Sequence, residues 1–382
     1  MKLILLTWNF PPAVGGMEIM IARIFEGLRQ RGHTVEAVTA WADNPPPMAG
    51  VHRAPRRGVP AYLFFCLRRG WHLCRTLRPD LILCGSLLSA PLGWLLARIF
   101  RCPWGCPLYG SDLATGGRVQ RWIARLLLRR ADILLPISRF TADLAERRGA
   151  DPTRCVIIPP GVASAPFDRP PTSGAESIIT ACQGRRVLIT VGRLVRRKGV
   201  LEFVRNVMPS LVREIPDLLF LIVGDDGSQS LIHNKEGMRQ QIEAAIREHQ
   251  LEEHVRVLGK RPDAELLRLY FNAHVFVLPV LELPGDIEGF GIVFLEAGLA
   301  GVPSVATATG GIPDAIVDGQ TGLLVPPGDT AALQSAVLRL LQDDDLRQRL
   351  GQQAANRARH ELNWDNIIDR YEAALAGVVH QS

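Results

Sequence analysis

The segment Arg186–Gly199 reads RVLITVGRLVRRKG, and the rest of the chain repeats its pattern. Its first six residues form an apolar run of strand length, a glycine and a basic loop follow, and the helical stretch Leu201–Glu214 comes next. A strand, a loop and a helix in this order form the repeating unit of a parallel sheet covered by helices. The segment therefore predicts an α/β domain that binds ligands at the loop after the strand.

The same alternation of apolar runs and helical stretches extends in both directions. Before the segment we expect strands at Lys2–Thr7, Val35–Ala40, Leu81–Cys84, Ile133–Ile137 and Val156–Ile158, with helices at Glu18–Arg31 and Pro91–Phe100. After it we expect strands at Leu218–Val223, Val255–Leu258, Val275–Leu278, Ser304–Ala306 and Gly322–Val325. The later helices are expected at Gly237–Glu248, Asp263–Asn272, Phe294–Ala300, Thr330–Leu341 and Asp345–Val379, the last interrupted around Leu362–Trp364. Two such series predict two Rossmann-like domains in tandem.

Length and composition agree with two folded domains. The chain has 382 residues, of which 47% are hydrophobic and 21% charged, and this excludes a disordered or fibrous protein. Prolines and small residues crowd into Ala163–Arg186 and predict a linker over 166–186. We therefore expect a first domain at 1–165, a second at 187–355 and a C-terminal helical segment at 356–382.

Charge is divided unequally between the two halves. Residues 1–165 carry 22 Lys and Arg against 10 Asp and Glu, a balance of +12, whereas residues 166–382 carry 22 against 28, a balance of −6. The basic half predicts contact with an anionic surface. At 100° per residue, Arg118, Arg121, Arg125 and Arg129 fall within about 80° of each other on one amphipathic helix. This helix would either dock on anionic lipid headgroups or pack on the sheet with its arginines in water.

The cysteines and the apolar runs of the sequence indicate the cellular compartment of the protein. The seven cysteines form no CxxC pair, which argues against a disulfide framework and a zinc finger and favours a reducing cytoplasm. The apolar run after Met1 is too short for a secretory leader. Leu81–Ala97 lacks charge, but Gly85 and Pro91 interrupt it, so we expect a strand and a helix there instead of a membrane span. The predicted location is the cytoplasm, with a peripheral place on the inner face of the cytoplasmic membrane left open.

Two loops after predicted strands carry groups suited to anions. Gly15 and Gly16 open a helix, where paired glycines let backbone N–H groups approach an anion. After Gly192, the guanidinium of Arg193 and the ammonium of Lys198 would clamp a diphosphate. Each pattern alone also fits a turn without a ligand or a solvated basic loop.

The segment Glu288–Glu296 reads EGFGIVFLE and enters a helix. Its two carboxylates would accept hydrogen bonds from sugar hydroxyls, and Gly289 and Gly291 would let the backbone approach a phosphate. Glu296 follows Phe294 and Leu295, and a carboxylate in such an apolar stretch needs a partner.

The order of these motifs resembles that of the retaining GT-B glycosyltransferases of family 4, the large group related to bacterial mannosyl- and glucosyltransferases. The matches run from about residue 3 to about residue 372 and comprise Gly15–Glu18, Tyr109–Asp112, Ile137–Phe140, Pro159–Val162, Val191–Gly199, Ile222–Asp225, Glu288–Glu296 and Gly310–Asp314. The resemblance implies a GT-B fold with a cleft between the domains and a C-terminal helix that crosses back to the first domain. It makes 1–165 the acceptor-binding domain and 187–355 the donor-binding domain.

The resemblance also implies roles for single residues. In that family the matches of Arg193 and Lys198 bind the donor diphosphate, the match of Glu296 takes the ribose hydroxyls, and the match of Glu288 contacts the transferred sugar. Further donor contacts are implied for Gly15, Gly16, Gly192, Phe290, Gly291 and Ile292, and for the base at Lys260 and Arg261. Tyr109, Asp112 and Ser138 are acceptor or sugar-side candidates, although Tyr109 stands where the family often has His.

The implied activity is that of a retaining, metal-independent hexosyltransferase. A hexose would move from GDP-mannose or a UDP-sugar to a hydroxyl acceptor, for which a lipid-linked saccharide and a polysaccharide precursor are both open. Arg193, Lys198 and Glu288 would carry the catalysis, without a metal, a cofactor or a nucleic-acid partner. Two alternatives remain, namely a non-catalytic GT-B protein that binds a nucleotide sugar and a sugar-nucleotide epimerase.

Overall fold

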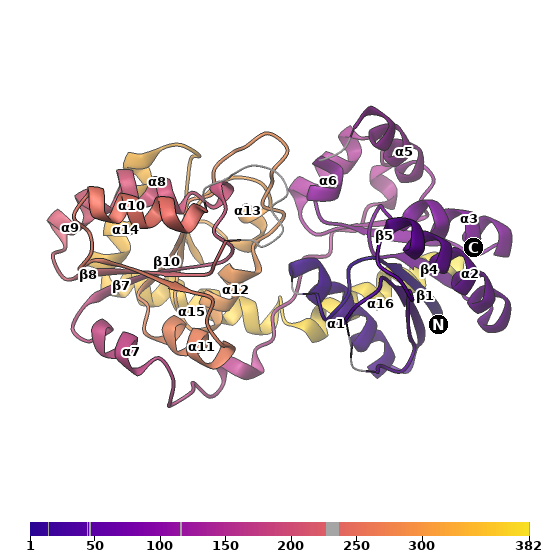
Figure 1. Ribbon diagram of the computed structural model, residues 1–382, viewed down its shortest axis with the longest axis horizontal. Coiled ribbons are helices and arrows are strands. Elements are labelled where there is room, and N and C mark those ends of the chain that lie inside the picture. Colours follow the sequence, from indigo (N-terminus) through magenta and orange to yellow (C-terminus); the bar gives the residue numbers. More distant parts are fainter. Residues whose placement is uncertain (14, 44, 46, 115–116, 227–236, 382) are drawn as a thin grey trace. The chain divides into compact units, whose positions relative to one another are not determined.

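The computed structural model describes residues 1–13, 15–43, 45, 47–114, 117–226 and 237–381 (Figure 1). The chain divides into two compact units, the first comprising Met1–Gly161 and Trp364–Ser382 and the second Val162–Asn363. Each unit contains one six-stranded sheet in which the neighbouring strands pair in parallel. The expected α/β architecture is therefore confirmed.

The sheet of the first unit has the strand order β3-β2-β1-β4-β5-β6. Its strands are β1 (Lys2–Thr7), β2 (Thr34–Thr39), β3 (Val51–Arg53), β4 (Leu81–Cys84), β5 (Trp104–Leu108) and β6 (Ile133–Pro136). The helices are α1 (Gly16–Gln30), α2 (Val59–Leu77), α3 (Ala90–Phe100), α4 (Ser111–Ala114), α5 (Arg118–Leu128), α6 (Arg139–Arg147) and α16 (Trp364–Gln381), with a 3₁₀ turn η1 (Pro152–Arg154).

The sheet of the second unit has the order β12-β11-β10-β7-β8-β9. Its strands are β7 (Arg186–Val191), β8 (Leu218–Val223), β9 (Val255–Gly259), β10 (Val275–Leu278), β11 (Ser304–Thr307) and β12 (Gly322–Val325). The helices are α7 (Glu176–Cys182), α8 (Val200–Asn206), α9 (Met208–Glu214), α10 (Met238–Glu248), α11 (Asp263–Phe271), α12 (Ile292–Leu299), α13 (Ile312–Ala315), α14 (Thr330–Gln342) and α15 (Asp344–His360), with 3₁₀ turns η2 (Ala165–Phe167) and η3 (Arg196–Lys198). Figure 1 shows α8, α10 and α14 on one face of this sheet and α7, α11 and α15 on the other.

Both sheets reverse their strand order at the first strand of the unit, between β1 and β4 in one and between β7 and β10 in the other. In open parallel sheets, ligands bind outside the carboxyl ends of the strands at such a reversal. In the second unit the loops at this place are residues 192–199 after β7 and 279–291 after β10. The topology therefore brings together the two motifs that the sequence singles out.

The sequence predicts neither β3, which has only three residues, nor β5, whose apolar pattern is interrupted. Gly105 and Pro107 lie inside β5, which is nevertheless fully buried between β4 and β6. The expected strand Val156–Ile158 does not form, although the N–H groups of Val156 and Ile158 donate to carbonyls of β6 at 2.9 and 3.0 Å. The sequence continues as Pro159-Pro160, which lacks the N–H donors needed to extend this pairing.

Two segments belong to other structural units than the sequence predicts. The expected linker 166–186 forms part of the second unit, where it contains α7, and Phe167 packs its ring against Tyr270 and Phe271 at centroid distances of 6.3 and 6.1 Å. The expected C-terminal segment 356–382 is shared, because α15 ends in the second unit and α16 belongs to the first.

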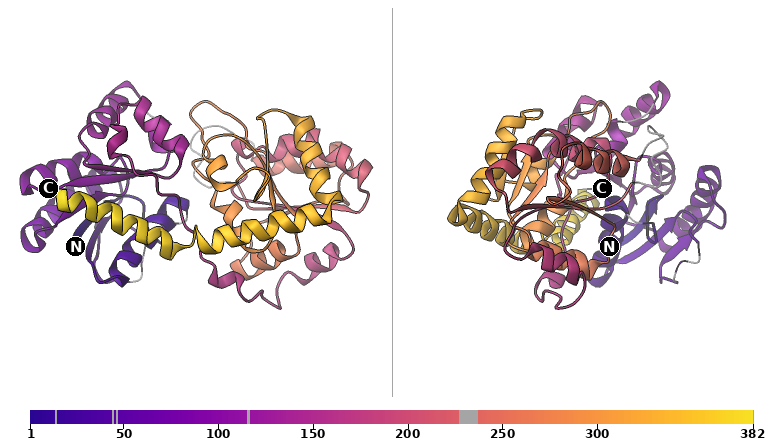
Figure 2. Two further views of the ribbon diagram at one scale, coloured as in Figure 1. Left: turned by 180° about the vertical axis from the view of Figure 1, so that it is seen from behind. Right: turned by 60° about the vertical axis from the view of Figure 1, so that its left-hand side comes forward.

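Helix α16 packs against α1 in the first unit (Figure 2). A Cβ atom on Gly27 would lie 2.6 Å from Cγ1 of Ile368, so the two helices approach closely at this glycine. Arg31 binds Asp369 at 2.6 Å, and the imidazole of His33 lies 2.8 Å from Glu372. The return of the chain to its first unit is thus fixed by both packing and ion pairs.

Within the described residues, no helix combines the length and the apolar content that crossing a bilayer requires. The uncharged stretch Leu81–Ala97 divides between β4 and α3, as expected.

Replacing Gly27 and Gly377 separately by alanine tests the packing of α16. Both glycines lie inside helices, where alanine is favoured by about 1 kcal/mol. A Cβ on Gly377 meets nothing within 4 Å, so Gly377→Ala should raise the free energy of unfolding. Gly27→Ala should lower it by about 1–3 kcal/mol through the clash with Ile368.

Urea denaturation followed by circular dichroism measures both effects. Combining Gly27→Ala with Ile368→Ala should cost less than the sum of the single changes, because the second change removes the clash. Equal stabilisation by the two alanines would show that α16 does not pack on α1 in this way.

Candidate active site

The loop after β7 contains two buried cationic side chains. Arg197 and Lys198 are only 7% and 9% exposed, whereas the preceding Arg196 faces solvent. Gly199 allows the loop to press against the end of β10, because a Cβ there would lie 1.9 Å from the carbonyl oxygen of Pro279. With φ at +67°, Gly199 also adopts a conformation that other residues rarely take.

Both buried cations bind one carboxylate, that of Glu288 on the loop after β10. The Nζ atom of Lys198 lies 2.7 Å from Glu288 Oε2, and Nη1 of Arg197 donates to the same oxygen. The Nε atom of Arg197 donates to Asp286 Oδ1 at 2.7 Å. The backbone carbonyl of Arg197 accepts from the N–H of Leu281 at 2.7 Å. Arg197 therefore joins the two loops at the reversal of strand order, and we call Arg197, Lys198, Asp286 and Glu288 the switch-point cluster.

The two cations determine how Glu288 ionises. Burial opposes the charged carboxylate, but the attraction of Lys198 and Arg197 and the hydrogen bonds from both outweigh burial and lower the pKa of Glu288 to about 2. Burial lowers the pKa of Lys198, an effect that Glu288 partly offsets. Glu288 is therefore a carboxylate at neutral pH, and it serves as a hydrogen-bond acceptor and not as a proton donor.

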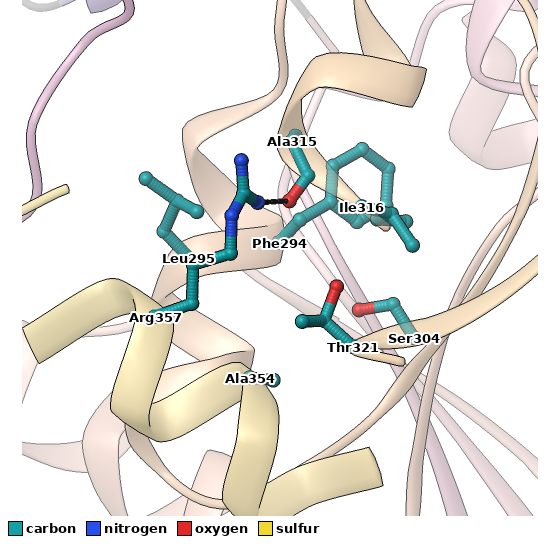
Figure 3. Close-up of a pocket in the computed structure, with 8 residues that line it drawn as sticks. All are labelled: Phe294, Leu295, Ser304, Ala315, Ile316, Thr321, Ala354 and Arg357. Carbon is teal, nitrogen blue, oxygen red and sulfur yellow. Dashed lines mark hydrogen bonds between the residues drawn. The ribbon is translucent and has the colours of Figure 1, made fainter. Parts of the chain in front are cut away.

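The backbone of Glu288 is held from behind by the start of α13. The N–H of Gly311 donates to the carbonyl of Glu288 at 2.9 Å, and a Cβ on Gly310 would lie 2.4 Å from that carbonyl oxygen. At the other end of α13, Arg357 of α15 donates to the carbonyl of Ala315 (Figure 3). Figure 3 also shows the small cavity beside this contact, which is lined by Phe294, Leu295, Ser304, Ala315, Ile316, Thr321, Ala354 and Arg357.

Glu296, the second carboxylate of the motif, lies in α12 and has the partner that the sequence requires. The buried hydroxyl of Tyr270, on α11, donates to Glu296 Oε2 at 3.0 Å. Burial raises the pKa of Glu296, and this hydrogen bond opposes the rise. Tyr270 precedes Glu296 by 26 residues on a different helix, so no local sequence pattern identifies it.

The remaining predicted donor contacts surround the switch-point cluster. Arg193 is exposed on the same loop as Lys198. Phe290 buries its side chain, so only its backbone is left for a ligand, and Gly291 with φ at +91° precedes the first residue of α12, Ile292. The first N–H groups of an α-helix lack partners within the helix and attract anions.

Lys260 and Arg261 follow β9 at the same end of the sheet. Lys260 is exposed, and Arg261 lies 3.5 Å from Glu265. Because β8 separates β9 from β7, these residues begin about 10 Å from the loop that carries the two buried cations.

Comparison with known proteins identifies the family. Residues 178–357 match the family described as "Glycosyl transferases group 1", and residues 15–161 match "Glycosyl transferase 4-like domain". A D-inositol 3-phosphate glycosyltransferase of Corynebacterium diphtheriae is 30% identical over 322 residues, which cover 78% of this chain and 71% of the relative. The chain belongs to the group 1 glycosyltransferases.

A second relative and a solved structure agree with this assignment. The GDP-mannose-dependent alpha-(1-6)-phosphatidylinositol monomannoside mannosyltransferase of Mycolicibacterium smegmatis is 31% identical over 275 residues, 69% of each chain. Sucrose-phosphate synthase from Thermosynechococcus elongatus has a TM-score of 0.79 at 24% identity over the full length of both chains, which shows a shared fold. The predicted family and the GT-B class are confirmed, and the protein is an enzyme that transfers glycosyl groups.

In the first unit of this glycosyltransferase, the acceptor-side candidates lie at the carboxyl ends of β5 and β6. Tyr109 is 5% exposed, and burial raises the pKa of its hydroxyl well above the usual range. Asp112 Oδ1 accepts from the backbone N–H of Tyr109 at 3.2 Å, and burial raises the pKa of Asp112 to about 6. Ser138 is fully buried and caps α6, where its hydroxyl accepts from the N–H of Thr141 at 3.2 Å. Asp112 and Ser138 therefore also have structural roles, and a serine directly before a helix is a sequence signal for such a cap.

The paired glycines of the glycosyltransferase lie at the start of α1. Gly15 precedes the helix and Gly16 is its first residue. Beside them, the amide of Asn9 donates to Glu18 Oε1 at 2.7 Å, which ties the loop after β1 to the first turn of the helix. Their contact with a donor stays a prediction.

Replacing Glu288 by glutamine leaves Arg197 and Lys198 buried without their shared anion. We expect the free energy of unfolding at pH 7 to fall by about 3–5 kcal/mol. The pKa of Glu288 in the folded protein is about 2, below the ordinary value of 4.5, so its stabilisation is complete above about pH 5 and is lost as the pH falls toward 2. The difference between wild type and Glu288→Gln should therefore shrink on acidification.

Urea denaturation at several pH values from 7 to 3.5 measures this difference. Asp286→Asn is the matched control, since Asp286 binds the same guanidinium with a side chain that is 55% exposed, and its effect should be smaller. A Glu288→Gln effect that is equally large at pH 3.5 and pH 7 would contradict the assigned ionisation.

Proposed function

We propose that this glycosyltransferase moves a hexose from a nucleoside-diphosphate sugar to a hydroxyl group of an acceptor. The observation that carries the proposal is the switch-point cluster, in which two buried cations share Glu288 at the reversal of strand order. The name of the Mycolicibacterium smegmatis relative states a dependence on GDP-mannose. GDP-mannose and UDP-sugars are both compatible with the residues of the cluster.

The diphosphate of the donor is assigned to the loop after β7 and the start of α12. Arg193 is exposed there, and the ammonium of Lys198 carries three N–H donors, more than one carboxylate oxygen uses. The helix N-terminus at Gly291 and Ile292 adds partial positive charge. The ribose is assigned to Glu296, which Tyr270 orients, and the base to the region of Lys260 and Arg261.

The transfer proceeds with retention and without a metal ion in this proposal. The bond from the anomeric carbon to the diphosphate oxygen breaks, the bond to the acceptor oxygen forms on the same face, and the acceptor proton moves to the departing diphosphate. Arg193 and Lys198 stabilise the negative charge that develops on the leaving group. Glu288 accepts hydrogen bonds from hydroxyls of the sugar, a role that suits a carboxylate with a pKa of about 2.

The acceptor is assigned to the first unit. We propose a lipid-linked saccharide or a glycolipid as its class, and a cytoplasmic enzyme placed peripherally at a membrane. The Mycolicibacterium smegmatis relative supports this class because its name contains a phosphatidylinositol mannoside. Tyr109 and Asp112 remain the proposed sugar-side groups.

Calorimetric titration with GDP and UDP tests the donor site on a matched pair of variants. Arg193→Ala removes an exposed cation assigned to the diphosphate, and Arg196→Ala removes another exposed cation three residues along the loop. A hydrogen bond to a charged group is worth about 1.5–3 kcal/mol, so Arg193→Ala should weaken nucleotide binding about tenfold to a hundredfold. Arg196→Ala should leave it within about twofold of wild type.

If both variants lost the same nucleotide affinity, Arg193 would contribute only nonspecific electrostatic attraction. Its assignment to the diphosphate would then be wrong. The second titrant, the nucleotide sugar itself, separates the remaining alternatives. Turnover of the donor to an epimer without an acceptor would favour an epimerase, and binding without any transfer to a hydroxyl acceptor would favour a non-catalytic protein.

A further inference from the structure

Three helices of the first unit form one layer on a single face of its sheet. Helix α2 contacts β1 and β2, α3 contacts β4 and β5, and α3 contacts both α2 and α5. Aromatic contacts join neighbouring helices, since the rings of Trp71 on α2 and Phe100 on α3 lie 5.2 Å apart, and the guanidinium of Arg130, just after α5, lies 5.6 Å from the ring of Trp94 on α3. Helix α3 therefore lies between α2 and α5, and we call the outer sides of these three helices, labelled in Figure 1, the α2–α3–α5 face.

Each helix of this face has large apolar side chains that are exposed to solvent. Phe64 on α2 is 71% exposed, Ile99 on α3 is 47% exposed and Trp122 on α5 is 65% exposed. Further exposed apolar residues are Leu67, Trp71, Leu95 and Val119. Burying one such side chain would gain about 1.5–3 kcal/mol, so exposed apolar groups on three adjacent helices indicate a surface that meets an apolar phase.

The sequence of α5 fits either a helix that docks on lipid headgroups or one that only packs on the sheet. The burial of its side chains favours the first. A helix that only covers the sheet would bury its whole apolar side. Leu127 and Leu128 do enter the core, but Val119 and Trp122, in the first turns of the helix, stay outside it beside Arg118 and Arg121. The first half of α5 thus presents apolar and basic side chains together to solvent.

The face carries arginine and no acid. Residues 59–130 contain 11 arginines and only two acidic residues, Asp80 and Asp112, neither of which lies on α2, α3 or α5. Exposed arginines occur on or directly after each of the three helices: Arg68, Arg75, Arg98, Arg101, Arg118, Arg121, Arg125 and Arg129. The positive charge is therefore not compensated on the surface itself.

Basic and apolar residues alternate at helical spacing. On α2, Phe64, Arg68, Trp71 and Arg75 follow one another at steps of three or four residues and so lie on one side of the helix. An interface with a folded protein gathers its apolar residues at a centre and uses charges of both signs to fix the register. Aromatic residues scattered among arginines, without acids, instead suit the boundary between lipid headgroups and acyl chains.

We propose that the α2–α3–α5 face docks on an anionic phospholipid surface. Each arginine near such a surface contributes about 1 kcal/mol, and Phe64, Ile99 and Trp122 would insert their side chains below the headgroups. The inference rests on this face alone and not on the proposed donor chemistry. It deepens the proposed function in one respect, since docking would place the acceptor domain at the headgroups that carry a lipid acceptor.

Sedimentation of the full chain with vesicles tests the proposal. Vesicles of phosphatidylcholine mixed with phosphatidylglycerol should bind the protein, and vesicles of phosphatidylcholine alone should bind it at least tenfold more weakly. Binding should weaken as salt is added, because screening shortens the range of the attraction. Failure to bind the anionic vesicles, or equal binding to both kinds, would overturn the proposal.

Two matched pairs of variants locate the contact on the face. Ile99→Ser should weaken binding about fivefold to tenfold, whereas Ile19→Ser on α1, where the isoleucine is 46% exposed, should not change it. Arg98→Glu should weaken it about tenfold or more, whereas Arg213→Glu on α9 of the second unit should not. Equal effects within either pair would overturn the assignment to this face.

Two control measurements show whether a loss of vesicle binding has a cause other than the α2–α3–α5 face. Nucleotide titration of the surface variants should match wild type, so that a loss of vesicle binding cannot come from unfolding or from the donor site. Light scattering detects the competing occupant, a second copy of the chain. A dimer that Ile99→Ser dissociates, without vesicle binding by wild type, would replace the membrane with self-association.

Discussion

The ion pairs of the Glu288 carboxylate with Arg197 and Lys198 are the interaction on which the proposed active site depends. The carboxylate lies between two buried cations that would otherwise have no common anion, and Arg197 extends the same contact to Asp286. The loop after β7 and the loop after β10 are joined by the contacts of Arg197 with Asp286 and Glu288 and by the contact of Lys198 with Glu288. The strand order places the two loops side by side, and the ion cluster sets how their side chains point.

The supports of the cluster extend through the second unit. Gly311 holds the backbone of Glu288, and Arg357 on α15 holds the other end of the same short helix. Tyr270 fixes Glu296 from α11 in a similar way. The groups assigned to the donor are therefore set by partners that arrive from several distant segments, which preorganises the site before a ligand binds. In the first unit, the α2–α3–α5 face exposes basic and apolar side chains, and we assign this face to a phospholipid surface.

Sequence alone predicts the parts whose signal is local. Continuous apolar runs gave correct strands at Lys2–Thr7, Leu81–Cys84 and Arg186–Val191, and the eight motifs identified the family. The sequence does not predict β5, because Gly105 and Pro107 break its apolar pattern. Arg197 was missed for a different reason, since a run of basic residues does not reveal which of its members turns inward. The contact of Tyr270 with Glu296 likewise depends on tertiary packing, because the two residues lie on different helices.

A double-mutant cycle between Arg197 and Glu288 tests most directly whether the cluster acts as one unit. The variants Arg197→Met, Glu288→Gln and the combination of both are compared with wild type for the affinity of the preferred nucleotide. We expect each single change to weaken binding and the double change to cost less than the sum, with a coupling of about 1–3 kcal/mol. Additive losses would show that Arg197 and Glu288 act independently, and the joined loops would then not be the basis of the site.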